Sequence, residues 1–203
     1  GPYHRFLNRT AARCVLSRCA HVFARGPETF THLSHLGIPS SVYSFAPDVA
    51  FCYKQGDSLT SENPSYSSVL CSYLSQHTHL RRVGICPSSL IASRSPAGYS
   101  DFLMTMIERL QDMNYSVVVF PHATRAKEMQ TFRNNDLKVI HELRRRCAES
   151  SHPDTEIMWV DKNVDSDTLH SIIQCCHVTV VSRFHAMIAS LSTRTPVCVL
   201  GWS

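Results

Sequence analysis

The feature that most constrains the fold of this 203-residue chain is a regular alternation of two kinds of apolar segment from residue 81 onward. Short runs rich in β-branched residues end at proline or serine turns, which is typical of buried strands. Longer runs place apolar side chains at helical spacing. Strands separated in this way by helices predict a parallel, doubly wound α/β sheet. The expected strands are residues 83–86, 116–120, 157–160, 178–181 and 196–200.

The first part of the chain repeats this pattern on a smaller scale. A helix is expected over residues 6–17, a strand over 21–24, a second helix ending at Gly37, and a strand over 42–45. About 50 residues are too few for an independent α/β domain, so residues 1–52 are expected to be the C-terminal part of a truncated lobe. Residues 53–80 are rich in serine and weakly periodic, which predicts a connector. Residues 81–203 are expected to form the second, larger lobe.

The strongest candidate site is the segment Ser182-Arg183-Phe184-His185, which lies between a predicted strand and a predicted helix. In open parallel sheets ligands bind at the carboxyl ends of the strands, and the N-terminus of the following helix favours an anion. If the segment is extended, Arg183 and His185 point the same way, toward a ligand. The alternative is that Arg183 pairs with a structural carboxylate while His185 caps its own helix.

Other residues are candidates for substrate binding because they follow predicted strands. The turn at Ser88 and Ser89 offers backbone N–H groups and hydroxyls to a phosphate or a sugar, although a plain turn would look the same. His122 is either a substrate contact or a solvated loop residue. Arg25 could bind an anion or be an ordinary surface arginine. Asp48 either orients an acceptor hydroxyl or, as we expect, caps the next turn.

Composition narrows the classes of partner. The formal net charge is +4, and the basic run at residues 144–146 lies at a predicted helix end without interleaved aromatic residues, so no nucleic-acid binding is expected. No apolar run approaches the ~18 residues that a membrane span needs.

The nine cysteines form no C-x-x-C pair, and most are expected to be small buried residues. The histidine pairs at 32/35 and 77/79 lack a third ligand, so neither a metal nor a cofactor is expected.

Several segments together resemble the polysaccharide pyruvyl transferase family. Residues 182–186 are similar to the family's segment in which an arginine and a histidine stand two apart, and residues 195–203 resemble the proline-led strand that follows it. Residues 24–26 and 47–51 resemble the part of the N-terminal lobe in which an arginine ends a strand and an Asp-x-Ala-Phe unit closes the lobe. Residues 120–122 fit a strand end of the second lobe. The order and spacing of these segments cover essentially the whole chain.

The resemblance implies a fold similar to the GT-B glycosyltransferases, with two Rossmann-like lobes: a near-complete C-terminal parallel sheet and an incomplete N-terminal lobe. It implies an enzyme that moves a pyruvyl group from phosphoenolpyruvate to two hydroxyls of a sugar in a polysaccharide or glycan, forming a ketal. Arg25 and Arg183 would bind the phosphate and carboxylate of the donor. Arg183 and His185 would be catalytic, with His185 moving protons. The remaining substrate contacts would be Ser88, Ser89 and His122.

The sequence departs from the family pattern in two places. Gly26 follows Arg25 where the family often has an acidic residue, so a local partner of this arginine is expected to be missing. A family lysine that follows the Trp-Ser pair would fall after Ser203, so the second lobe is expected to be truncated at its end.

Two other functions remain open from the sequence. One is another GT-B-like transferase that uses a nucleotide sugar, and the other is a non-catalytic remnant that binds a sugar or an anion. A nucleotide-sugar enzyme favours an acidic residue near the last strands, and residues 178–203 contain none. The compartment also remains open, because the family's bacterial members work in the cytoplasm and its fungal members in the Golgi.

Overall fold

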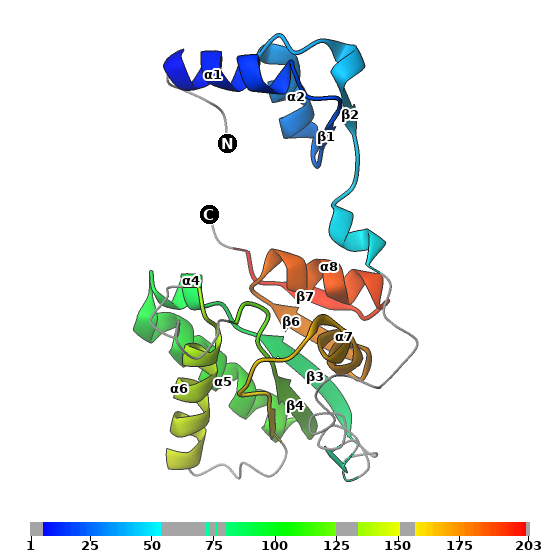
Figure 1. Cartoon of the computed structure of the whole chain (residues 1–203). Coiled ribbons are helices and arrows are strands. Elements are labelled where there is room, and N and C mark those ends of the chain that lie inside the picture. The colour runs from blue at the N-terminus through cyan, green and yellow to red at the C-terminus, as the bar shows by residue number, and fades with distance from the viewer. Residues whose placement is uncertain are drawn as a thin grey trace. The chain divides into compact units, whose positions relative to one another are not determined.

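The computed structural model describes residues 6–53, 72–73, 76, 80–124, 134–150 and 157–201. The chain divides into two units, Gly1–Cys52 and Tyr53–Ser203, and each has its own core (Figure 1). Most of the predicted connector at residues 53–80 lies outside the described residues. Among the residues that are described, no helix is both long enough and apolar enough to span a membrane.

Unit 1 pairs two short parallel strands and packs a helix against them. Its elements are α1 (Phe6–Leu16), β1 (Val22–Ala24), α2 (Pro27–His35), the 3-10 turn η1 (Ser40–Val42), β2 (Tyr43–Phe45) and the 3-10 turn η2 (Val49–Cys52). Leu33 of α2 packs with Ala24 of β1 and Tyr43 of β2 in the core of the unit. Gly37 follows α2 with a φ of +73°, a left-handed conformation that glycine adopts without strain. The helices and strands predicted for this segment are confirmed.

Unit 2 is built on one parallel sheet. Its elements are β3 (Arg81–Cys86), α4 (Ser89–Ala92), α5 (Pro96–Asp112), β4 (Tyr115–Val119), α6 (Leu137–Glu149), β5 (Ile157–Trp159), α7 (Ser166–Gln174), β6 (Val178–Val181), α8 (Phe184–Ser192) and β7 (Val197–Val199). The strands lie in the order β5-β4-β3-β6-β7, and every neighbouring pair is parallel. The five-stranded parallel sheet predicted from the sequence is confirmed.

Helices cover both faces of this sheet, because its inner strands are apolar on both sides. Helices α5 and α6 pack on one face, and α7 and α8 pack on the other (Figure 1). The largest fully buried helical side chains of the unit are Leu103, Ile107, Ile140, Leu143, Ile172, Ile173 and Ile188. The doubly wound arrangement expected from the alternation is therefore present.

The central strand β3 is packed so closely that one of its positions requires glycine. A Cβ atom at Gly84 would lie 2.9 Å from Cys176 Sγ and 3.1 Å from Thr179 Cγ2. Thr179 lies opposite Gly84 on β6. The absence of a side chain at Gly84 therefore lets Cys176, which follows α7, and strand β6 approach β3 closely.

Two expectations from the sequence are wrong. The short helix α4 (Ser89–Ala92) lies between β3 and α5, where only a turn was expected. Of the eight cysteines that the structure describes, Cys86, Cys147 and Cys176 are buried, so most of them are not core residues. Cys14 is exposed on α1, which buries none of its residues, and Cys198 is exposed on β7, the edge strand.

The strand order places a topological switch between β3 and β6. From β3 the chain proceeds to β4 and β5 on one side, and it then crosses to β6 and β7 on the other. In doubly wound sheets ligands bind at the carboxyl ends of the strands beside such a switch. The turns that follow β3 and β6 contain Ser88 and Arg183, so two of the candidate motifs lie on either side of the switch.

Candidate active site

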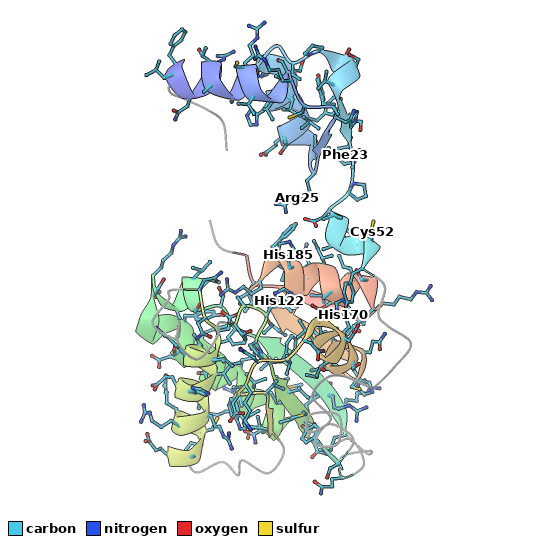
Figure 2. The ribbon with its side chains drawn as sticks, in the orientation of Figure 1. Phe23, Arg25, Cys52, His122, His170 and His185 are labelled. Atoms are coloured by element: carbon cyan, nitrogen blue, oxygen red, sulfur yellow. The ribbon has the colours of Figure 1, made fainter. Side chains whose placement is uncertain are left out.

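The site residues that the sequence predicted for unit 2 lie together at the carboxyl end of its sheet. Ser88 and Ser89 follow β3, His122 follows β4, and Arg183 and His185 follow β6. Figure 2 shows His122 and His185 at this same end of the unit. The turns after three strands together make up the candidate site.

A buried aspartate that the sequence did not single out, Asp136, joins these turns. Its carboxylate accepts backbone N–H groups from Ser89 at 2.9 Å, from Ala123 at 2.8 Å and from His122 at 3.3 Å. It also forms an ion pair with Arg183, whose Nε donates at 3.1 Å and whose Nη2 donates as well. The side chain of Asp136 is wholly buried, and a buried carboxylate is tolerated when it is paired and hydrogen-bonded in this way.

The sequence position of Asp136 suggests only a local role. It directly precedes α6, where aspartate is a common N-cap residue. Its carboxylate makes no bond to that helix. Its main partner, Arg183, lies 47 residues away in the sequence. The sequence pointed to such a residue only through the alternative prediction that Arg183 pairs with a structural carboxylate. That prediction did not identify the carboxylate.

Arg183 is held in place by several neighbours. Besides its pair with Asp136, its Nη1 donates to Asn134 Oδ1 at 2.7 Å and its Nη2 donates to Ser89 Oγ at 3.1 Å. The side chain is 11% exposed. These contacts match the alternative reading, in which Arg183 pairs with a structural carboxylate. A guanidinium has five N–H donors, and within the described residues one N–H of Nη1 has no partner.

The expectation that Arg183 and His185 share one extended segment is wrong. Helix α8 begins at Phe184, so Arg183, its N-cap residue, is extended and His185 is helical. Side chains two apart in a helix do not face the same way. The exposed ring of His185 lies 5.4 Å from the ring of Phe184 and 6.2 Å from the ring of His122, measured between centroids.

The two histidines of the site lie in different environments. Burial lowers the pKa of His122 to about 4, the carboxylate of Asp136 acts in the opposite direction, and the charges of His185 and Arg183 lower the pKa further. His122 is therefore neutral near pH 7 and can offer one hydrogen-bond donor and one acceptor. The exposed His185 is open to solvent.

The two serines of the β3 turn have different surroundings. The N–H of the buried Ser88 donates to Tyr99 Oη at 3.0 Å, and its Oγ has no hydrogen-bond partner among the described residues. Ser89 contacts Arg183 through its Oγ and Asp136 through its N–H. Ser89 is thus part of the arginine's environment, whereas Ser88 is held through its backbone.

The remaining candidate, Arg25, follows β1 in unit 1 and pairs with Asp48. Arg25 Nη1 lies 2.8 Å from Asp48 Oδ2, and the two side chains are 59% and 6% exposed. The other carboxylate oxygen of Asp48 accepts the N–H of Ala50 at 2.9 Å, so Asp48 caps the next turn as expected. Gly26 offers Arg25 no side-chain partner, and Asp48, which follows β2, pairs with it instead.

Metal-binding side chains do not gather in the parts of the chain that the structure describes. Within those parts, no group of three His, Cys, Asp or Glu residues is placed to hold a metal ion. His32 and His35 lie on α2, and the pair at 77/79 lies outside the described residues.

Replacing Asp136 by Asn should strongly destabilise unit 2. The amide keeps the size of the side chain but leaves the Arg183 guanidinium without its counter-charge, which costs about 3–5 kcal/mol for a buried pair. Asp101→Asn is the matched control, because Asp101 is 60% exposed in its pair with Arg146 and its loss should cost less than about 1 kcal/mol. Urea unfolding measures both. Equal effects of the two substitutions would contradict the role given to Asp136.

His122 should make unit 2 less stable in mild acid. Its folded pKa of about 4 lies below the ordinary 6.5, so between these values the unfolded chain binds the proton and the folded chain does not. Stability is therefore lost as the pH falls, by about 2 kcal/mol between about pH 7 and pH 5. His122→Gln should lose correspondingly less over the same interval in urea unfolding. The same pH dependence in both proteins would show that His122 is not the titrating group.

Comparisons with known proteins agree with the fold and extend over the whole chain. A family model described as polysaccharide pyruvyl transferase matches residues 1–203. Among solved structures, an α,α-trehalose-phosphate synthase (UDP-forming) from Burkholderia vietnamiensis is similar, with a TM-score of 0.52 and 11% sequence identity. That match covers 98% of this chain and 51% of the other, so this chain spans about half the length of the synthase. No curated protein matched.

The two comparisons carry different weight. At 11% identity, the likeness to the synthase shows the α/β fold alone. The family model, in contrast, covers every residue from the N-terminal unit to the end of the chain, including the turns that form the site. On this match the chain belongs to the polysaccharide pyruvyl transferase family.

Proposed function

We propose that the protein transfers the pyruvyl group of phosphoenolpyruvate to two hydroxyls of a sugar in a polysaccharide or glycan, forming a pyruvate ketal. The observation that carries the proposal is the gathering of a guanidinium, two imidazoles and two serines at the switch point of a parallel sheet. The family match supports the same class of transferase. These groups suit a donor that carries two anionic ends and must be protonated on carbon.

In this proposal Arg183 binds the donor as an oriented hydrogen-bond donor. The carboxylate of Asp136 balances the charge of Arg183. Arg183 would therefore bind an anion mainly through oriented N–H hydrogen bonds, and its positive charge would add little. The N–H of Nη1 that has no partner among the described residues is the group that would reach a donor oxygen. Ser89 Oγ, which already contacts Nη2, would lie beside the same oxygen. The neutral ring of His122 and the turn at Ser88 would complete the substrate contacts.

Arg25 is proposed to bind an anionic end of the donor with a more exposed charge. Its side chain is 59% exposed, although Nη1 contacts Asp48. Asp48 orients the guanidinium and at the same time reduces its net positive charge. That Arg25 and Arg183 bind the two ends of one donor molecule remains a prediction.

His185 is proposed to move the protons. It would donate a proton to the methylene carbon of phosphoenolpyruvate, which places positive charge on the central carbon. A sugar hydroxyl then attacks that carbon and gives up its proton, phosphate leaves with the electron pair of its C–O bond, and the second hydroxyl closes the ketal with loss of another proton. An imidazole suits these steps because it both donates and accepts protons near neutral pH.

Arg25→Ala should weaken binding of phosphoenolpyruvate about tenfold, because one charge-assisted hydrogen bond to an anion is lost at a partly exposed position. Arg25→Lys should lose less, since it keeps a positive charge beside Asp48. Arg18→Ala is the control, because Arg18 follows α1 and contacts Cys14 of that helix. Titration calorimetry measures donor affinity in each variant. Unchanged affinity in Arg25→Ala would remove Arg25 from the donor site.

His185→Gln should lower the rate of pyruvyl transfer by a factor of about 10²–10⁴, because an amide hydrogen-bonds but does not shuttle protons. Donor affinity should change far less, since the arginines remain. His141→Gln on the exposed side of α6 is the control. The assay follows pyruvate transfer from phosphoenolpyruvate to a β-galactoside. Near-normal turnover in His185→Gln would make His185 a non-catalytic residue.

The same assay separates the proposal from the main alternative. Turnover with phosphoenolpyruvate and none with a nucleotide sugar supports pyruvyl transfer. Turnover with a nucleotide sugar in the absence of phosphoenolpyruvate would replace it with glycosyl transfer. Binding of sugars or anions without turnover of either donor would favour the non-catalytic function.

A further inference from the structure

Tyr99 lies beneath the switch point and contacts both of the turns beside it. It belongs to α5, which packs against the sheet, and its side chain is buried in the core on that face. Its hydroxyl accepts the N–H of Ser88 at 3.0 Å and donates to Ser182 Oγ at 2.7 Å. Ser182 follows β6, and its own N–H donates to the carbonyl of Cys86 at the end of β3 at 3.0 Å.

These contacts complete a closed ring of interactions around the switch point. Ser88 is covalently joined to Ser89, and Ser182 is covalently joined to Arg183. Ser89 and Arg183 contact each other through Oγ and Nη2 at 3.1 Å. The Tyr99 hydroxyl closes the ring on the opposite side by joining Ser88 to Ser182. The Tyr99 phenol therefore fixes Ser88 and Ser182, the chain neighbours of Ser89 and Arg183.

The geometry of the ring requires a hydroxyl at this position. A buried backbone N–H and a buried serine Oγ both meet the Tyr99 oxygen, which serves as acceptor for one and donor to the other. Removing that oxygen leaves both groups without their partner in a dry environment. Burial raises the pKa of the Tyr99 phenol, so it keeps its proton and continues to donate to Ser182.

We propose that Tyr99 is a positioning residue, which fixes the spacing between the Ser88–Ser89 turn and the Ser182–Arg183 turn so that one anionic donor meets both. This inference rests on the proposed function of the site. Tyr99 does not touch the donor itself. It acts through the backbone of Ser88 and the side chain of Ser182.

The test compares Tyr99→Phe with Tyr73→Phe in the intact protein. Tyr73 is a buried tyrosine of the same unit, and its hydroxyl contacts Ser116 Oγ and the carbonyl of Val117 on β4, away from the turns of the site. Both variants lose one buried hydroxyl. Tyr99→Phe should raise the KM for phosphoenolpyruvate about tenfold, with a smaller change in the KM for the sugar acceptor. Tyr73→Phe should lower thermal stability without raising the KM for the donor.

A second variant tests whether Tyr99 acts through Ser182. It also keeps the proposal testable if Tyr99→Phe does not fold. Ser182→Ala should raise the KM for the donor in the same direction, and the double variant should be no worse than the poorer single one, since neighbours in one network are not additive. Full additivity, or a KM for the donor that Tyr99→Phe changes no more than Tyr73→Phe does, would overturn the proposal.

Hydrogen exchange separates this inference from the proposed function. The backbone amides of Ser88 and Ser89 should exchange faster in Tyr99→Phe than in Tyr73→Phe, whatever reaction the protein catalyses. If the unaltered protein does not use phosphoenolpyruvate but these amides are selectively deprotected, the proposed function fails and the positioning role of Tyr99 stands. If the protein uses phosphoenolpyruvate and these amides keep their protection, the positioning role fails and the function stands.

Discussion

The carboxylate of Asp136 is wholly buried at the carboxyl end of the unit 2 sheet, where an unpaired charge would cost several kcal/mol. Three backbone N–H groups and the guanidinium of Arg183 satisfy it. Those donors come from the turns after β3, β4 and β6, which are otherwise separate connections. The need to satisfy one buried charge therefore holds three turns in one arrangement, and the candidate site is the surface that this arrangement creates.

This arrangement changes how an anion would be bound. Because Asp136 balances Arg183, the pair offers directional N–H groups rather than a free positive charge. The N-terminus of α8, where Arg183 is the N-cap residue, adds backbone N–H groups and the positive end of the helix dipole. In unit 1, the exposed guanidinium of Arg25 is likewise oriented by an aspartate. Both arginines are thus held in defined orientations, which suits recognition of a phosphate or carboxylate more than general attraction of anions.

The two imidazoles of the site are separated by environment. Burial keeps His122 neutral near pH 7, so it suits a fixed hydrogen-bonding role. His185 is exposed in the first turn of α8, with its ring 6.2 Å from that of His122. Two similar side chains in different surroundings can take different roles in one site, one as a hydrogen-bonding group and the other as the group that transfers protons. This division supports His185 rather than His122 as the group that exchanges protons with substrate and solvent.

Local patterns in the sequence were sufficient to predict the parallel sheet and the helices on both of its faces. They also predicted the strand ends that carry Ser88, His122 and Arg183, because strand and helix periodicity is encoded within each segment. The short helix α4 was missed, since four residues contain too little periodicity to detect. Tertiary structure alone decided that Asp136 pairs with Arg183 and that Tyr99 joins Ser88 to Ser182. Asp136 and Arg183 lie 47 residues apart, and Tyr99 lies 11 residues from Ser88 and 83 from Ser182. The strand order β5-β4-β3-β6-β7 brings the turns after β3 and β6 side by side. Such pairings depend on which strand ends become neighbours, and that property belongs to the assembled sheet and is not present in any one segment of the sequence.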